Sequence, residues 1–303
     1  MNEPPINAMT ALSESSHPRT FRENAYVYPV LSRRAGGISI GINLNPDKVC
    51  NFDCIYCQVD RSKKPQDYFV GLPVLLDELR AVLSGLQSGG ALWSEPEFRD
   101  LPAEKRRVTD ISFSGDGEPT TFKNFSEVVT RCTEVKESLG FNTQKVVLIT
   151  NATGFDRLDV RLGLNFMDAH HGEIWAKLDA GTPEYFALID NTAFPFQKVL
   201  DNIAGCARQR ETVIQSCFMR VKGVGPAADE ISAYVARLNE VVALGGRIKW
   251  VQVYTVARNP AYSIVSSLSD AEVDAIAARV RQETQLPSLA FYGDVPEGRG
   301  LMG

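Results

Sequence analysis

Short apolar runs alternate along the chain with longer stretches of helical period, and this alternation limits the possible folds more than any other feature. β-Branched residues are concentrated in six runs of strand length, at residues 37–44, 109–114, 145–150, 173–178, 212–219 and 249–256. Apolar residues recur at helical spacing near 73–87, 124–139, 196–209, 229–244 and 269–284. Repeated strand–helix units predict a parallel sheet with right-handed crossovers. Periodicity alone does not separate an open doubly wound sheet from a curved partial barrel.

Polar residues follow every predicted strand, at the point where the strand ends. The carboxyl ends of parallel strands meet on one rim of such a sheet, and ligand sites of α/β folds are found there. We therefore expect these residues to form one site. In chain order they are the loop of Cys50, Cys54 and Cys57, the segment 112–120, Thr150 and Asn151, Lys177 and Asp179, Gln215 and Ser216, and the segment 254–258.

The loop after the first predicted strand has the motif C-x3-C-x2-C, formed by Cys50, Cys54 and Cys57. A closed zinc site or a fully protein-ligated [4Fe–4S] cluster takes four protein ligands, and this loop offers three. Three thiolates can hold three irons of such a cluster and leave the fourth iron open to a small molecule. The alternative is a zinc ion whose fourth ligand comes from elsewhere, for which the candidates are His170, His171, Cys132, Cys206 and Cys217.

The composition is that of an ordinary globular protein, with 44% apolar and 23% charged residues. No apolar run is long enough to cross a membrane, and the N-terminal residues lack the basic and apolar regions of a signal peptide. These features predict a cytoplasmic protein without a membrane partner, in which the cysteines stay reduced. Residues 1–20 are rich in Ser, Pro, Thr and Asn and are expected to form a flexible tail, followed by a single domain at 21–303.

The net charge of −5 argues against strong non-specific binding of nucleic acid, because phosphate contacts require concentrated Lys and Arg. Three short basic spots interrupt this acidic balance, at Arg33-Arg34, at 61–64 and at 105–107. Only the first two flank the cysteine loop. We therefore expect a solvated surface at 105–107 and consider a functional role for the other two.

The cysteine loop, with Tyr56 directly before its last cysteine, resembles the signature of the radical S-adenosylmethionine (SAM) superfamily. The resemblance implies an α/β fold, a partial (β/α)6 TIM-like barrel with a C-terminal helical and strand extension. It implies one [4Fe–4S] cluster on the three cysteines and SAM bound at the open iron. The reduced cluster cleaves SAM to a 5′-deoxyadenosyl radical that abstracts hydrogen from a substrate. The electron would come from an external donor, a flavodoxin or ferredoxin.

Two further segments match the superfamily in part. The run Gly115-Asp-Gly-Glu-Pro119 resembles a Gly-Gly-Glu-Pro segment that accepts hydrogen bonds from the SAM ammonium, although Asp116 replaces one glycine. The alternative is an ordinary turn between a strand and a helix. Lys177 and Asp179 share a face of the predicted strand and match residues that bind the carboxylate and ribose of SAM. The alternative for this pair is a buried structural ion pair.

Three weaker candidates, Asn151, Ser216 and Arg258, are assigned by the resemblance to the ribose, the adenine or the substrate. Each could equally be a turn residue or a satisfied buried polar group. The residues assigned in this way to SAM or its surroundings are Tyr56, Gly115, Asp116, Gly117, Glu118, Asn151, Lys177, Asp179, Ser216 and Arg258.

Within the superfamily, residues 28–260 are most similar to the wybutosine-synthesis-like group of tRNA-modifying enzymes. That group carries a second cluster on upstream cysteines, whereas no cysteine precedes Cys50 here. The chain also has no flavodoxin-like domain and lacks the basic balance of a tRNA binder. We therefore leave the substrate unassigned and do not favour tRNA.

Two readings from other classes remain. One is a non-catalytic metal-binding interaction protein, and the other is a superfamily member that uses SAM for ordinary methyl transfer. The long segment 88–108 before the second predicted strand is a candidate lid or substrate loop, with a passive surface insertion as the alternative.

Overall fold

The computed structural model describes residues 12–13, 19–65 and 67–299. Its main sheet has eight strands that are hydrogen-bonded in the order β1-β2-β3-β4-β5-β6-β8-β10. β1 is antiparallel to β2, and every later neighbour is parallel. The strands are β1 (Val27–Ser32), β2 (Gly37–Ile42), β3 (Val108–Phe113), β4 (Lys145–Thr150), β5 (Gly172–Lys177), β6 (Thr212–Cys217), β8 (Ile248–Tyr254) and β10 (Ser288–Phe291).

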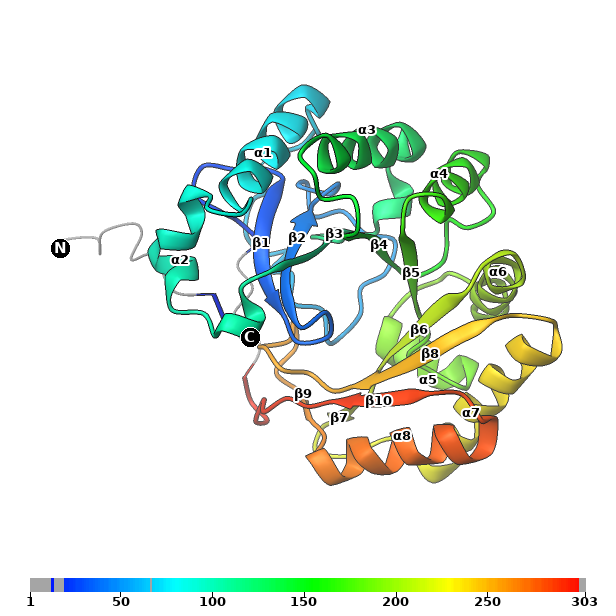
Figure 1. The fold of residues 1–303 in the computed structure, drawn as a ribbon. Coiled ribbons are helices and arrows are strands. Elements are labelled where there is room, and N and C mark those ends of the chain that lie inside the picture. Colours follow the sequence, from blue (N-terminus) through cyan, green and yellow to red (C-terminus); the bar gives the residue numbers. More distant parts are fainter. Residues whose placement is uncertain (1–11, 14–18, 66, 300–303) are drawn as a thin grey trace.

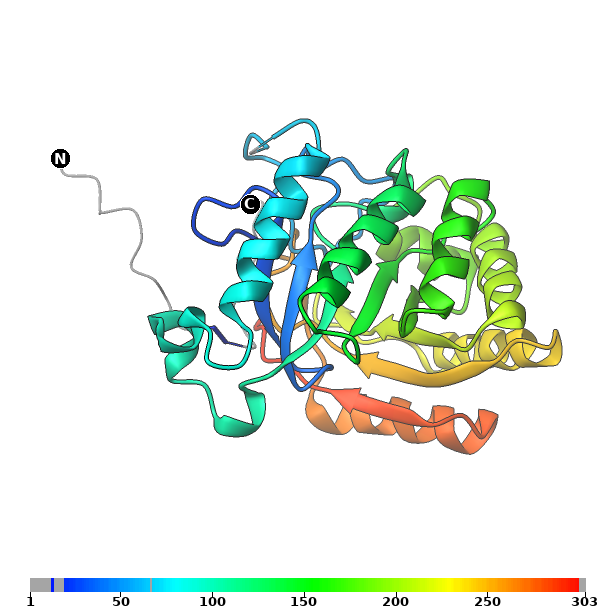
Figure 2. The same ribbon diagram turned by 45° about the horizontal axis from the view of Figure 1, so that its top comes forward.

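The sheet curls into a half-barrel with its helices on the outer face (Figure 1). Figure 2 shows α1, α3 and α4 lying across that face. A small second sheet pairs β7 (Met219–Val221) with β9 (Val265–Ser267). The helices are α1 (Leu72–Gly85), α2 (Pro96–Arg99), α3 (Phe125–Ser138), α4 (Leu158–Asp168), α5 (Pro183–Asp190), α6 (Phe196–Gln209), α7 (Ala228–Ala243) and α8 (Asp270–Thr284).

The predicted partial (β/α)6 barrel is confirmed, and α8, β9 and β10 form its C-terminal extension. Each of the six predicted strands and five predicted helices is present, although the run 212–219 divides into β6 and β7. α8 begins with a capping box, in which the side chains of Ser269 and Glu272 each accept a hydrogen bond from the other residue's backbone amide. The sequence did not predict β1, β10, α4 or α5. β1 contains Pro29, which a sheet tolerates here because β1 is an edge strand.

In strand β2, polar and apolar residues alternate between the cavity side and the helix side of the sheet. Its side chains alternate between the two faces, as in any strand. Ser39 lines the inner cavity. The residues of β2 that alternate with Ser39 face the helices. They are Ile38, Ile40 and Ile42, and they are fully buried in the main core together with Leu75 and Leu79 of α1. Burial of these large apolar side chains under the helices fixes which face of the sheet remains for the site.

The β1–β2 hairpin reaches across the open side of the half-barrel. The Arg33 guanidinium, in its turn, donates a hydrogen bond to the carbonyl oxygen of Tyr292, just after β10. The Arg34 guanidinium lies 5.1 Å from the ring centre of Tyr254, the last residue of β8. The first and last parts of the sheet are therefore connected at this edge, and a cavity lies between them.

The segment 88–108 leads into the N-terminal end of β3, where the Ile38 amide donates to the carbonyl of Arg107 at 2.9 Å. The cysteine loop follows the other end of β2, so this segment lies at the opposite end of the strands and does not cover that loop. The expected flexible tail, residues 1–20, lies mostly outside the described residues. None of the helices in the described residues combines the length and the apolar character needed to cross a membrane.

Candidate functional site

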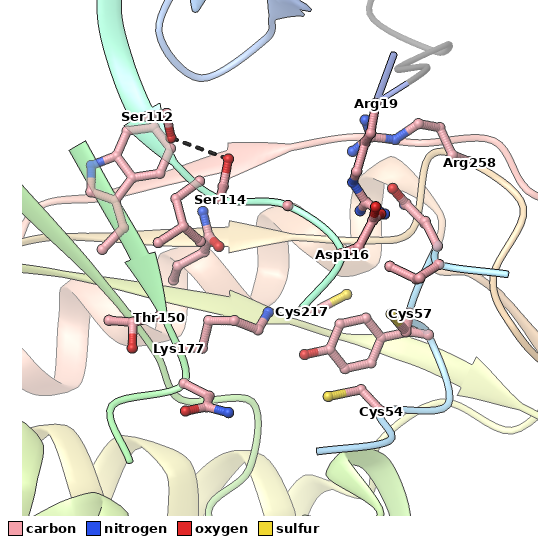
Figure 3. Close-up of a pocket in the computed structure, with 18 of the residues that line it drawn as sticks. Arg19, Cys54, Cys57, Ser112, Ser114, Asp116, Thr150, Lys177, Cys217 and Arg258 are labelled. Carbon is pink, nitrogen blue, oxygen red and sulfur yellow. Dashed lines mark hydrogen bonds and ion pairs between the residues drawn. The ribbon is translucent and has the colours of Figure 1, made fainter. Parts of the chain in front are cut away.

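A cavity inside the half-barrel collects most of the residues that the sequence selected (Figure 3). It is bounded by the cysteine loop, the loop after β3, and the ends of β4, β5, β6 and β8. The predicted site residues that line it are Cys50, Cys54, Cys57, Tyr56, Gly115, Asp116, Gly117, Glu118, Asn151, Lys177 and Arg258. The strand ends therefore line one cavity, and a binding role for these residues stays a prediction.

The cysteine loop is held by backbone contacts. The Ile55 amide donates to the carbonyl of Ile189 at 2.9 Å, and the Cys57 amide to the carbonyl of Cys54 at 2.9 Å. Phe52 packs edge-on against Phe186 of α5, with the ring centres 5.6 Å apart. The loop is thus attached to the end of α5, a helix the sequence did not reveal.

Two of the three cysteines in the loop have a close polar neighbour. The Cys54 thiol donates to Asp190 Oδ1 at 3.3 Å, and Cys57 Sγ accepts from Arg61 at 3.4 Å. Burial raises the pKa of Cys50 and raises that of Cys54 further. These two groups are therefore thiols at neutral pH, and a metal bound here would have to replace their protons.

The donor set fits an iron–sulfur cluster. The three thiols line one cavity, and thiolates are the usual ligands of such clusters. In residues 12–13, 19–65 and 67–299, no three His, Cys, Asp or Glu side chains are gathered around a single ion position.

Among the candidates for a fourth ligand, only Cys217 lines the cavity. Cys132 of α3 and Cys206 of α6 are buried in the main core under those helices. His170 stacks on Phe166 with ring centres 4.1 Å apart, and the His171 carbonyl accepts from the Val146 amide near the start of β4. The two histidines therefore lie at the end of the strands opposite the cysteine loop.

The loop after β3 packs tightly against the start of the cysteine loop. A Cβ on Gly115 would lie 2.3 Å from Asn43 Oδ1, and a Cβ on Gly117 would lie 2.2 Å from the carbonyl oxygen of Val49. No side chain fits at either position without displacing its neighbour, so glycine is required there. Asp116, between them, forms an ion pair with Arg19 at 3.0 Å and accepts from Asn43 at 2.8 Å.

Glu118 connects this loop to the end of β4. Its buried carboxylate accepts hydrogen bonds from the Thr120 amide and hydroxyl at 2.9 and 2.5 Å. It also accepts from the Thr150 hydroxyl at 2.6 Å and the Asn151 amide at 2.7 Å. Burial raises the pKa of Glu118 in spite of these bonds. The carboxylate therefore holds the rim together, and its predicted contact with the SAM ammonium stays a prediction.

Asn151 fixes the cysteine loop to the end of β4. Its side-chain amide donates to Asn51 Oδ1 at 2.8 Å, and Asn51 in turn donates to Thr153 Oγ1 at 2.8 Å. Asn51 is the residue after Cys50. These bonds set the distance between the cysteine loop and the β4 end, which is a positioning role that the sequence did not suggest for Asn151.

Lys177 extends from the end of β5 into the cavity between two tyrosines. Its Nζ donates to the Tyr254 hydroxyl at 2.8 Å, lies 4.8 Å from the Tyr56 ring centre and forms an ion pair with Asp179 at 3.2 Å. Burial disfavours the ammonium, but Asp179 and Tyr254 outweigh it and raise the pKa of Lys177 well above its ordinary value. The ion pair that the sequence left as the alternative is present, and Lys177 nevertheless lines the cavity.

Asp179 is buried behind Lys177. It accepts from the Cys217 amide at 2.6 Å and from the Tyr56 hydroxyl. The carboxylate thus joins the cysteine loop to β5 and β6, through Tyr56, Lys177 and Cys217.

Ser216 is not brought to the cavity. Its hydroxyl lies 2.6 Å from the Tyr234 hydroxyl of α7, and both groups are buried outside the sheet. Gln215 and Cys217, on either side of it in β6, are the residues that line the cavity. Alternation along the strand requires this result, and Ser216 is the satisfied buried polar group that the sequence left as the alternative.

Asp110 of β3 lines the same cavity, and its raised pKa predicts how the stability of the protein depends on pH. It accepts from the Ser39 hydroxyl at 2.5 Å, and burial raises its pKa to about 6, with Lys145 and Glu173 as its charged neighbours. The folded state therefore keeps this proton between about pH 4 and 6, where the unfolded chain loses it. We expect this contribution to stability, roughly 1–3 kcal/mol, to disappear as the pH rises through that window.

Urea unfolding at several pH values between 4 and 8 measures this effect. The Asp110→Asn variant has no such proton, so its stability should fall less than that of the parent chain over the window. Identical pH profiles for the two proteins would contradict the assignment.

The chain was compared with known proteins in sequence. No model of a protein family matches it. A GTPase Obg of Brachyspira hyodysenteriae is 23% identical over 253 residues, which cover 81% of this chain and 32% of that protein. A UPF0026 protein of Helicobacter pylori is 22% identical over 217 residues, 70% of this chain and 61% of that protein. The chain thus spans less than two thirds of the length of these relatives.

The sequence contains no Gly-Lys pair and therefore no P-loop motif, in which Gly-Lys is followed by Ser or Thr.

The structural comparison is more informative about the fold. A radical SAM methyltransferase from Sphaerobacter thermophilus superposes with a TM-score of 0.61, at 13% sequence identity, over 88% of this chain and 69% of that one. The chain therefore has the partial-barrel fold of the radical SAM enzymes.

Proposed function

We propose that this protein is a radical SAM enzyme with one [4Fe–4S] cluster on Cys50, Cys54 and Cys57 and with SAM as its second cofactor. The observation that carries the proposal is that this three-thiol loop opens into the cavity that also holds Tyr56 and Lys177. The shared fold supports it. When bound, the cluster would supply an open iron for SAM and an electron for its cleavage.

Residues of the chain would prepare the cavity for both cofactors. Arg61, whose guanidinium donates to Cys57 Sγ, would place positive charge beside the thiolates that hold the cluster. The Lys177 ammonium, fixed between Tyr56 and Tyr254, provides a cation for the carboxylate of SAM. Because these groups are already held by neighbours, little reorganisation is needed when a ligand arrives.

The electron would come from an external flavodoxin or ferredoxin. The cysteine loop is accessible from outside, since the Val49 side chain beside Cys50 is 63% exposed. Exposed Lys63 and Lys64 follow the loop. Such a surface is suited to an acidic partner, whose approach it would accelerate at low ionic strength.

Anaerobic reconstitution with iron and sulfide tests the proposal. We expect about four irons per chain and formation of 5′-deoxyadenosine from SAM when dithionite is added. Folded protein that holds one zinc ion, stays colourless and has no affinity for SAM would instead identify a metal-binding interaction protein. Methylated product without 5′-deoxyadenosine would point to ordinary methyl transfer.

A further inference from the structure

Four arginines from three separate segments meet at one side of the cavity. Arg19 precedes β1, Arg33 and Arg34 form the turn of the β1–β2 hairpin, and Arg258 follows β8. In Figure 3, Arg19 and Arg258 lie near each other, on the other side of Asp116 from Cys54 and Cys57. We call these four residues the arginine cluster.

Arg19, Arg34 and Arg258 carry more positive charge than the described residues around them neutralise. Asp116 pairs with Arg19 at 3.0 Å. Arg34 rests on the rings of Trp175 and Tyr254, at 5.6 and 5.1 Å from their centres, which attract a cation without neutralising it. This concentration of guanidinium groups contrasts with the net charge of −5 for the whole chain.

Arg258 shows the imbalance most clearly. Its Nε is buried and has no hydrogen-bond partner among the described residues. Burial, together with repulsion from Arg34, Arg19 and Arg33, lowers the pKa of Arg258 to about 9. A buried N–H donor without an acceptor costs stability, and natural sites retain such a group when a ligand supplies the acceptor.

We propose that the arginine cluster binds an oxyanion group of the substrate, a carboxylate or a phosphate. The planar fork of a guanidinium matches both groups, and several guanidiniums around one cavity suit a group with two or three oxygens. The assignment to the substrate rests on the proposed function, in which the cysteine loop and Lys177 serve the cluster and SAM.

The cluster adjoins the predicted SAM contacts on the side away from Cys54 and Cys57. Lys177 ion-pairs with Asp179 and contacts the Tyr56 ring in the cysteine loop, and its Nζ donates to the hydroxyl of Tyr254, on whose ring Arg34 rests. Arg258, which the sequence left open between SAM and the substrate, lies near Arg19. A substrate held by its acidic end at the arginines would direct its remaining atoms toward the cysteine side of the cavity. That is where hydrogen abstraction would take place.

Calorimetric titration of the full chain with inorganic phosphate, and separately with malonate, tests the inference. We expect at least one of the two anions to bind, and Arg258→Gln to weaken that binding by about tenfold or more. The preferred anion tells which group the site accepts. Arg258→Gln should fold normally, because Arg258 Nε makes no hydrogen bond that the substitution could remove and because loss of the charge relieves repulsion between the arginines. Arg34→Gln is a second variant, for which we expect the same loss of anion affinity.

Arg131→Gln is the matched control, since Arg131 is an exposed arginine of α3 paired only with Glu134 at 3.4 Å. Its anion affinity should equal that of the parent chain. Equal binding to the parent and to both cluster variants, or no binding of either anion to the parent, would overturn the inference. So would an equal loss of SAM affinity in Arg258→Gln, because the cluster would then belong to SAM. Arginine-dependent anion binding in a chain that takes up no iron would leave the anion site standing and would reject the proposed function.

Discussion

Replacement of Cys54 by alanine is expected to reduce the iron content of the reconstituted protein from about four per chain to well below one. Formation of 5′-deoxyadenosine should fall by about 100-fold or more, because two thiolates cannot hold a cluster that three retain. Cys54 is the most informative of the three, since its thiol lines the cavity and donates to Asp190. Iron analysis, the visible absorption spectrum and product chromatography measure the loss.

A matched control removes a thiol that lies elsewhere. Cys132 is fully buried in α3, among core side chains and away from the cavity. Cys132→Ala should lose some stability through the small void it leaves, and it should keep its iron. If Cys54→Ala retained iron and SAM cleavage, the cysteine loop would not be the cluster site.

The second large effect concerns stability. Glu118→Ala removes the acceptor of four hydrogen bonds at the junction of the β3 loop with the end of β4. Each donor is left without its partner in a buried position, so we expect a loss of about 3 kcal/mol or more in the free energy of unfolding. Urea denaturation measures it directly.

Glu134→Ala serves as the comparison for this effect. Glu134 lies on the surface of α3, with 55% of its side chain exposed, and contacts only Arg131. Its removal should change stability by less than about 0.5 kcal/mol. A similarly small change in Glu118→Ala would show that the carboxylate does not hold this rim, and a direct role toward a ligand would then be the better explanation.

The strand order and the cysteine loop could be predicted because their signals are local. The spacing of Cys50, Cys54 and Cys57 needs no partner elsewhere in the chain, and strand–helix alternation prescribes parallel neighbours. The edge strand β1 was not predicted because Pro29 is atypical of strands. The strand β10 was not predicted because it is too short to show a clear alternation of apolar and polar residues.

The remaining parts of the site depend on contacts between distant residues. Arg19 and Arg258 are near one another only because the sheet curls and the β1–β2 hairpin crosses its open side. Ser216 was assigned to the wrong face because a sequence pattern places a strand more reliably than it tells which residue faces inward. Glu118 was recognised as polar and near the site, but its four donors come from three separate residues that no spacing reveals.

Gly115 and Gly117 bear on how this family of sequences can diverge. Their Cα atoms lie so close to Asn43 and Val49 that the loop after β3 and the start of the cysteine loop form one packed unit. A larger residue at either glycine would shift the cysteines without altering any of them. Neither loop can then change its position independently of the other, and a relative that has lost these glycines should not be assumed to share the function proposed for this chain, even when its three cysteines remain.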